Sequence, residues 1–145
     1  MLFSQAFAAW TIAVTIDKDQ PWKAGQRMYR VKVAGVSDGS DPAEFNLSTY
    51  LSSGWDGDMA KIKGGLFYMV ETDPGTASDA VWAVSFDSDL GANILDLSGL
   101  SVTATEMHDG ANDLGFAPAV FDVGVDIGDI GSASDSVDIY IYILK

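Results

Sequence analysis

Hydrophobic and polar residues alternate one by one over several short stretches of this chain. The clearest early examples are segments 10–16 and 27–36, whose alternate positions hold the large apolar residues Ile12, Val14, Ile16, Tyr29, Val31 and Val33. Because successive side chains of a β-strand point to opposite faces of the sheet, this period of two predicts half-buried strands. By the same reasoning, further strands are expected at residues 45–49, 66–70, 81–86, 94–100 and 102–105.

The last strand, expected at residues 137–144, has large residues on both of its faces. One face carries Val137, Ile139, Ile141 and Ile143, and the other carries Tyr140, Tyr142 and Leu144. A strand of this kind needs cover on both sides. It is therefore expected either at the centre of a sheet or with its tyrosine face against another subunit.

These stretches predict an all-β fold, an antiparallel β-sandwich or small barrel of about 7–8 short strands, because turn signals separate them and no convincing helical periodicity is present. Glycines in segment 52–65 predict a loop or twisted hairpin there. Residues 108–136 are rich in Asp, Gly, Ala and Ser, show little regular periodicity except around residues 119–125, and predict one long loop. A loop of that length is typical of a functional segment, an interface or a segment ordered by a ligand.

The length of 145 residues predicts one β domain over residues 10–145, preceded by an arm or edge segment at residues 1–9. The apolar residues Leu2, Phe3 and Phe7 favour an arm that packs on a neighbour, although a first core strand explains them as well. The segment lacks the pattern of a secretory signal, and no apolar run approaches the roughly 20 residues of a membrane span. A soluble chain with no membrane partner is expected.

The charge is distributed very unevenly along the chain. Residues 64–144 hold fourteen acidic residues and no lysine or arginine, residues 1–63 hold seven of each sign, and the net charge is −13. Such a charge opposes direct binding to nucleic acid or to anionic membranes. It favours simple solubility, divalent cations or a basic partner. The chain has no cysteine, which excludes disulfides and thiolate metal sites.

Clusters of Asp and Gly are the first candidates for chemistry. Calcium takes six to eight oxygen ligands, and the best-spaced candidates are Asp122, Asp126 and Asp129. No cluster matches a complete EF-hand loop, and capping of turns by Asp is the competing interpretation. The expectation is therefore no cofactor, with calcium as the one alternative.

Catalytic patterns are weak. His108 is the only histidine, which rules out a multi-histidine metal site, and no Gly-x-Ser-x-Gly motif occurs. We expect a non-enzymatic protein. Trp22 and Trp55 lie in polar segments, where an indole could stack on a sugar face, although tryptophan more often serves as a core or interface anchor.

One region carries a resemblance to a known class of proteins. The segment Gly-Gly-Leu-Phe-Tyr-Met-Val at residues 64–70 is followed by Asp73-Pro74-Gly75 and by an alternating strand that ends in Asp87-Ser88-Asp89-Leu90-Gly91-Ala92-Asn93-Ile94-Leu95. This pattern resembles small structural proteins of tailed bacteriophages. Asn93 stands where the turn of those proteins would have Asp.

The resemblance implies a virion structural protein that is assembled in the host cytoplasm. It would act as a capsid decoration or cement protein, or as a neck component, through contacts with capsid or neck proteins. The resemblance also implies a homo-oligomer, with a trimer as one form. The expected interface residues are Leu2, Phe3, Phe7, Arg27, Arg30, Lys32, Tyr140 and Tyr142. The alternative function is a carbohydrate-binding β-sandwich, calcium-dependent or not, with Trp22 or Trp55 as the stacking residue.

Overall fold

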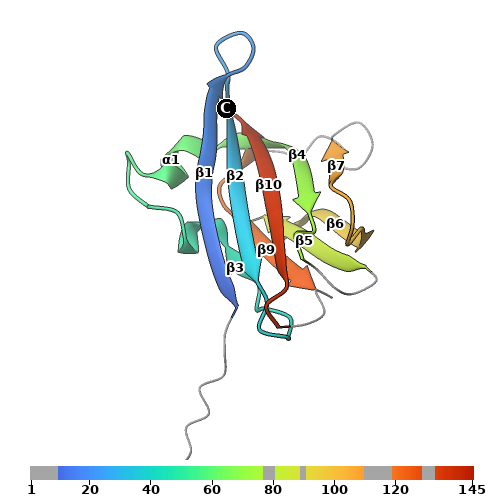
Figure 1. Cartoon of the computed structure of the whole chain (residues 1–145). Coiled ribbons are helices and arrows are strands. Elements are labelled where there is room, and N and C mark those ends of the chain that lie inside the picture. The colour runs from blue at the N-terminus through green and yellow to red at the C-terminus, as the bar shows by residue number, and fades with distance from the viewer. Residues whose placement is uncertain (1–9, 77–80, 89–90, 110–118, 129–132) are drawn as a thin grey trace, which may run out of the picture.

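The structure is a computed structural model that describes residues 10–76, 81–88, 91–109, 119–128 and 133–145, and it is a sandwich of two antiparallel β-sheets (Figure 1). Sheet A contains, in spatial order, β1 (Thr11–Pro21), β2 (Arg27–Val36), β10 (Ser136–Leu144), β4 (Gly65–Asp73) and β7 (Glu106–Asp109), and β8 (Ala119–Val120) also pairs with β4. Sheet B contains β3 (Phe45–Asn46), β9 (Val123–Gly128), β5 (Trp82–Ser88) and β6 (Asn93–Leu100). The predicted all-β sandwich is confirmed.

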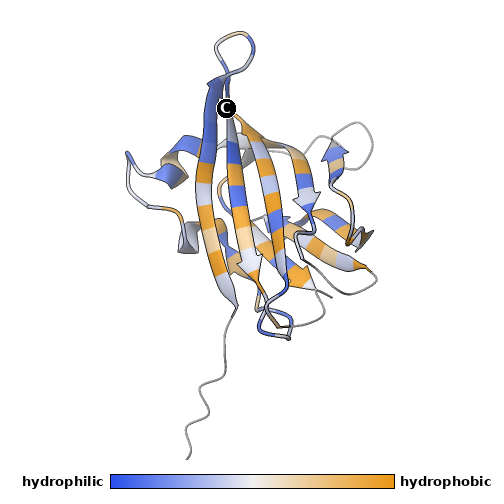
Figure 2. Cartoon of the chain, viewed as in Figure 1, coloured by the Kyte–Doolittle hydropathy of each residue, from blue (hydrophilic) through white to orange (hydrophobic). Residues whose placement is uncertain are grey.

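The core lies between the two sheets and is built from the alternate positions of their strands. Hydrophobic and hydrophilic residues alternate visibly along β2 and β10 in Figure 2, whereas the second half of β1 is hydrophilic throughout. The most deeply buried residues are Val31, Val33, Val70, Ile139, Ile141 and Ile143 from sheet A and Trp82, Phe86, Val125 and Ile127 from sheet B. The rings of Phe67 and Phe86 meet across the sandwich with their centroids 5.4 Å apart. Burial of this apolar layer is the main stabilising contribution to such a fold.

Strand β10 lies at the centre of sheet A, between β2 and β4 (Figure 1). The four residues of its isoleucine and valine face are at most 1% exposed. The expected central position of this strand is therefore confirmed, while a contact of its tyrosine-bearing face with another subunit stays a prediction. Tyr140, Tyr142 and Leu144 lie on the other side of the strand and belong to a separate apolar cluster outside the core.

The prediction of one long loop at residues 108–136 is wrong. Strand β9 lies inside that range and is an interior strand of sheet B, paired with β3 on one side and β5 on the other. Val123, Val125 and Ile127 are buried, while Gly124, Asp126 and Gly128 occupy the alternate positions. Glycine and aspartate have low strand propensity, so their presence at the outward positions made this segment resemble a loop although its buried residues follow a period of two.

The side chains of β4 do not alternate regularly between the two faces of the sheet as a period of two would predict. The register shifts between Tyr142 and Ile143 of β10, whose partners are Met69 and Phe67, so Tyr68 forms a β-bulge. A bulge inserts one extra residue and reverses the side-chain alternation beyond it. Phe67 and Val70 therefore both face the core, and Leu66 and Tyr68 are exposed.

Segment 52–65 contains a short helix, α1 (Asp58–Ile62), in place of the expected loop or hairpin. Its Met59 and Ile62 are one helical turn apart and both are buried, which explains why this segment is helical despite its polar sequence. A 3-10 turn, η1 (Leu47–Thr49), follows β3. The strand expected at residues 102–105 begins later, as β7. Within the described residues, no helix is both long and apolar enough to cross a membrane.

Candidate interaction surfaces

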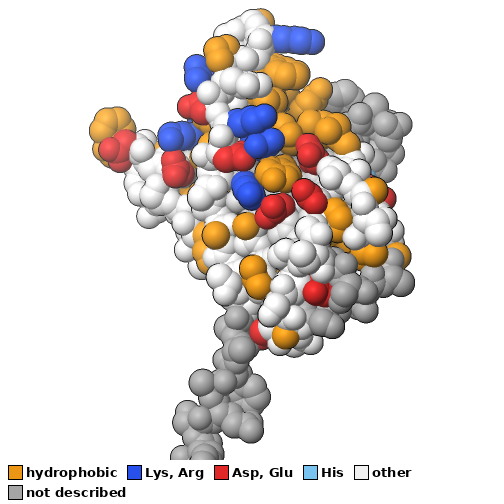
Figure 3. Space-filling model, viewed as in Figure 1, with side chains coloured by type: hydrophobic (Ala, Val, Ile, Leu, Met, Phe, Trp, Pro, Cys, Tyr) orange, Lys and Arg blue, Asp and Glu red, His pale blue; other side chains and the backbone are white. Residues whose placement is uncertain are grey.

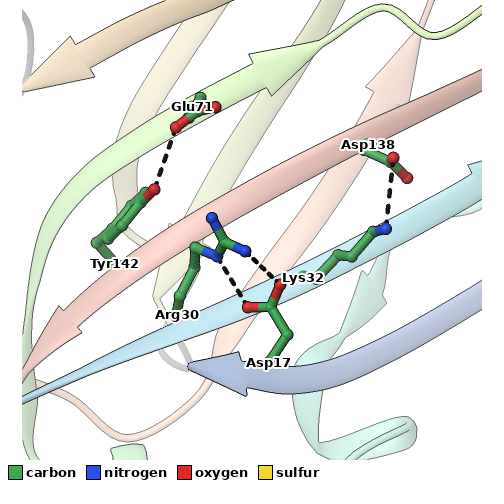
Figure 4. A network of polar contacts seen from close by, with 6 residues as sticks. All are labelled: Asp17, Arg30, Lys32, Glu71, Asp138 and Tyr142. Atoms are coloured by element: carbon green, nitrogen blue, oxygen red, sulfur yellow. Dashed lines mark hydrogen bonds and ion pairs between the residues drawn. The ribbon is translucent and has the colours of Figure 1, made fainter. Parts of the chain in front are cut away.

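The outer face of sheet A is organised around an ion pair between Arg30 and Asp17 (Figure 4). Arg30 lies on β2 and Asp17 on the neighbouring edge strand β1, where the register shifts between Ile16 and Lys18. The guanidinium donates from Nε to Asp17 Oδ1 at 2.9 Å and from Nη2 to Oδ2 at 2.6 Å. This two-point contact fixes the planar side chain of Arg30 against the sheet.

Two cations flank the ring of Tyr140 on the central strand. The guanidinium carbon of Arg30 lies 4.5 Å from the ring centroid, and Lys32 Nζ lies 5.7 Å from it. Lys32 also pairs with Asp138, one alternate position along β10, at 3.5 Å. Cations near an aromatic face are attracted by its negative potential, so Tyr140 is held by both neighbours.

Tyr142 extends the network to β4. Its hydroxyl donates a hydrogen bond to Glu71 Oε2 at 3.1 Å, and only 8% of the residue is exposed. Burial raises the pKa of the Tyr142 phenol, and the Glu71 carboxylate adds to that rise while Arg30 opposes it. Tyr142 is therefore a neutral hydrogen-bond donor at physiological pH.

An apolar cluster lies on the same face, at the end of sheet A next to the β1–β2 hairpin. Met28, Tyr142 and Leu144 are each less than 9% exposed, and Met69 and Tyr140 pack against them. Figure 3 views this face directly: basic and acidic side chains intermingle over its middle, and hydrophobic side chains gather above them. No described element lies over this surface. We call the cluster and the polar network together the tyrosine face: Asp17, Met28, Arg30, Lys32, Met69, Glu71, Asp138, Tyr140, Tyr142 and Leu144.

Of the three predicted basic interface residues, Arg30 and Lys32 lie on this face, whereas Arg27, at the start of β2, points to its other side. Each is paired with an acid of its own sheet. Arg27 pairs with Asp19 at 2.6 Å, in addition to the pairs of Arg30 and Lys32. Their positive charge is therefore largely balanced within the sheet. The predicted arm residues Leu2, Phe3 and Phe7 lie outside the described residues.

The calcium candidates are not brought together. Asp126 lies on the outer side of β9, whereas Asp122 precedes that strand and is engaged with η1; Asp129 lies outside the described residues. Partial burial raises the pKa of Asp126, and the carboxylates of Asp41 and Asp87 raise it further by repulsion. In the part of the chain that the structure describes, no three His, Asp or Glu side chains group as metal ligands would.

The two candidate sugar-stacking residues differ sharply. Trp22, in the β1–β2 hairpin, packs edge-on against Tyr68 with the ring centroids 5.9 Å apart and is 37% exposed. Trp55, in the loop before α1, is 92% exposed. It borders an open groove of about 550 Å³ together with Phe121, which is 55% exposed.

His108 lies on β7 directly opposite Val70 of β4, so it belongs to a strand and not to a loop. Its Nε2 is 3.9 Å from Glu106 Oε2, and 15% of its side chain is exposed. Neither His108 nor Glu106 lines the groove at Trp55.

Several residues of these surfaces were not singled out from the sequence: Asp17, Met28, Met69, Glu71, Phe121 and Asp138. Asp17 and Glu71 lie on strands adjacent to Arg30 and Tyr142, so only the strand order and register bring them together. Strand order was not readable from the sequence. Phe121 carried no distinct signal, because it ends an apolar run at residues 116–121 that also contains Phe116.

No family model, curated protein or solved structure matches this chain.

Proposed function

We propose that this chain is a non-enzymatic structural protein of a virus particle, a capsid decoration or neck component that acts through protein contacts on its tyrosine face. The observation that carries the proposal is the ordered network of Arg30, Tyr140 and Tyr142, together with the adjacent apolar cluster, on an outer sheet face over which no described element lies. Tyr, Met and Arg are the residue types most enriched in protein interfaces.

The order of this face supports the proposal. Arg30, Tyr140 and Tyr142 are held in one arrangement by Asp17, Lys32 and Glu71 before any partner binds. Side chains that are already fixed lose little conformational entropy on association. Large fixed side chains on an open sheet face are therefore suited to a permanent contact.

Because the basic residues of this face are paired with acids, we expect charge attraction to contribute little to the binding of a partner. Because Arg30 and Lys32 are neutralised by Asp17 and Asp138, attraction to an acidic capsid surface would contribute little. The partner surface should instead match the face by shape and apolar contact. Moderate sensitivity of the binding to salt is expected.

The type of assembly comes from the resemblance of residues 64–100 to structural proteins of tailed bacteriophages. A homo-oligomer, with a trimer as one form, belongs to the same proposal, as does assembly on the particle in the host cytoplasm. The net charge of −13 supports capsid or neck proteins, and not nucleic acid or membrane, as partners.

The proposal is tested by quantitative mass spectrometry of gradient-purified particles of the virus that encodes this chain. Peptide intensities are scaled to the major capsid protein to give a copy number. Many copies per particle would assign the chain to the capsid lattice, and a small fixed number would assign it to the neck. Absence from the particles would refute the proposal.

A further inference from the structure

The groove beside Trp55 is built differently from the environment of the other tryptophans. Trp82 is fully buried, Trp10 donates a hydrogen bond to the Ser40 carbonyl, and Trp22 packs on Tyr68. The indole of Trp55 is 92% exposed. This exposed indole offers an apolar surface on which a ligand could stack.

A second aromatic ring lies in the same groove. Phe121 lines it from the segment before β9, and α1 contributes Met59 and Ala60 from the other side. Lys63, which follows α1, places its ammonium 6.0 Å from the centroid of the Phe121 ring. The groove therefore combines two exposed aromatic surfaces with a hydrogen-bond donor. Its volume of about 550 Å³ falls within the range of small-molecule sites.

The carboxylate of Asp122 also lines the groove, and hydrogen bonds fix its orientation. Asp122 Oδ1 accepts hydrogen bonds from the backbone N–H groups of Ser48, at 3.2 Å, and Val123, at 2.8 Å. Asp122 Oδ2 accepts one from the Ser48 hydroxyl. These three bonds hold the carboxylate in one orientation, and each carboxylate oxygen accepts two hydrogen bonds, so Oδ2 keeps capacity for a ligand hydroxyl.

We propose that the Trp55 groove binds a neutral sugar. A pyranose ring has an apolar face of C–H groups, which packs on indole or phenyl rings, and hydroxyls at its edge that both donate and accept hydrogen bonds. Trp55 and Phe121 supply aromatic surfaces for the apolar face of the sugar. For its hydroxyls, Asp122 supplies a hydrogen-bond acceptor and Lys63 a donor. The Asp122 carboxylate and the net charge of −13 disfavour acidic sugars.

This inference is independent of the proposed structural function, because the groove and the tyrosine face share no residue. A particle protein that also holds a glycan would add an attachment role to its structural role. Failure of the sugar experiment would leave the particle proposal intact.

The experiment is a binding screen of the full chain against an immobilised panel of neutral oligosaccharides, two to four units long, of glucose, galactose, mannose and N-acetylglucosamine. The dissociation constant of the best probe is then measured in solution. Trp55→Ala and Phe121→Ala should each weaken that binding by about tenfold or more, because each removes one stacking surface. Trp22→Ala is the matched control, and its dissociation constant should stay within about twofold of the wild-type value.

The proposal is overturned if no probe of the panel binds at millimolar concentration, or if Trp55→Ala binds as well as the unchanged chain. Loss of binding in Trp22→Ala alone would overturn it too. Trp55 is almost fully exposed, so its replacement should not unfold the protein. The thermal unfolding curve of Trp55→Ala, unchanged from that of the wild type, confirms that a loss of binding is local.

Discussion

The guanidinium of Arg30 contacts both carboxylate oxygens of Asp17 across the β1–β2 pair, at 2.9 Å and 2.6 Å. The contact lies where β1 bulges, so the irregular edge of the strand and the fixed arginine belong to one arrangement. A bulge on an edge strand also opposes pairing with the edge of another molecule. This relationship links the stability of sheet A to the order of its tyrosine face.

Replacing Arg30 with alanine should therefore destabilise the protein. The side chains of the pair are 18% and 26% exposed, and the substitution also removes the contact with Tyr140. We expect a loss of about 1–2 kcal/mol in the free energy of unfolding, measured by urea denaturation. The control is Arg27→Ala, whose partner Asp19 is well exposed, and its effect should be clearly smaller. Equal effects of the two substitutions would contradict this account.

The contribution of this pair should depend on pH. The hydrogen bond from Arg30 holds the pKa of Asp17 below its ordinary value of 3.8. A carboxyl whose pKa is lowered by folding contributes stability above its unfolded pKa, and this contribution is lost as the pH falls through its folded pKa. The stability difference between the wild type and Arg30→Ala should be constant from about pH 7 to about pH 5. It should shrink below about pH 4, as urea denaturation across this range would reveal.

Whereas the ionised carboxylate of Asp17 stabilises the protein, that of Asp126 should destabilise it. Its pKa is raised, first by partial burial and then by Asp41 and Asp87, so its negative charge opposes folding once the pH exceeds the unfolded value. Asp126→Asn should raise the melting temperature slightly at pH 7, and the gain should vanish near pH 3, where the wild-type group is protonated. High salt should also reduce the gain. Differential scanning calorimetry measures both effects.

The matched control for that substitution is Asp138→Asn. Asp138 pairs with Lys32, so its neutralisation removes an attraction and should lower the melting temperature at pH 7. A rise in both variants would mean that only the net charge matters. In that case the local account of Asp126 would be wrong.

Gly65 should tolerate no side chain. A Cβ at this position would lie 2.5 Å from Ile143 Cγ2 and 2.9 Å from the Ile62 carbonyl oxygen. Gly65→Ala should cost about 2–3 kcal/mol of unfolding free energy, because the crowded atoms include backbone. At the adjacent Gly64 there is open space and a φ of +84°, so Gly64→Ala should cost only the backbone strain of about 1 kcal/mol. Chemical denaturation that ranked Gly64→Ala as the more damaging change would contradict the packing at the start of β4.

The elements that the sequence predicted well are those in which a period of two is carried by large side chains. Val31 and Val33 in β2, and the isoleucines of β10, are such cases, because their alternation directly reflects burial on one side. Strand β9 was missed since two of its outward positions are glycine. The end of the Glu44 side chain lies beside Gly124, and this glycine belongs to a paired strand and not to a loop.

The candidate surfaces were predictable only in part. Tyr140 and Tyr142 were identified from the two-sided pattern of their strand, and Trp55 from its polar surroundings. Their partners could not be predicted, because Asp17 and Glu71 reach them only through the order of strands in sheet A. The groove at Trp55 likewise depends on the approach of Phe121, which is distant in the sequence.

The most direct test of the central claim is hydroxyl-radical footprinting of the chain in purified virus particles and as the free protein. Met69, Met107 and Tyr140 are the reporters on the outer side of sheet A, and Trp55 is the internal control away from it. The account predicts that modification of Met69, Met107 and Tyr140 falls several-fold in the particle while Trp55 remains reactive in the absence of sugar. Equal modification of the sheet A residues in the two states would contradict the claim that this face is the particle interface.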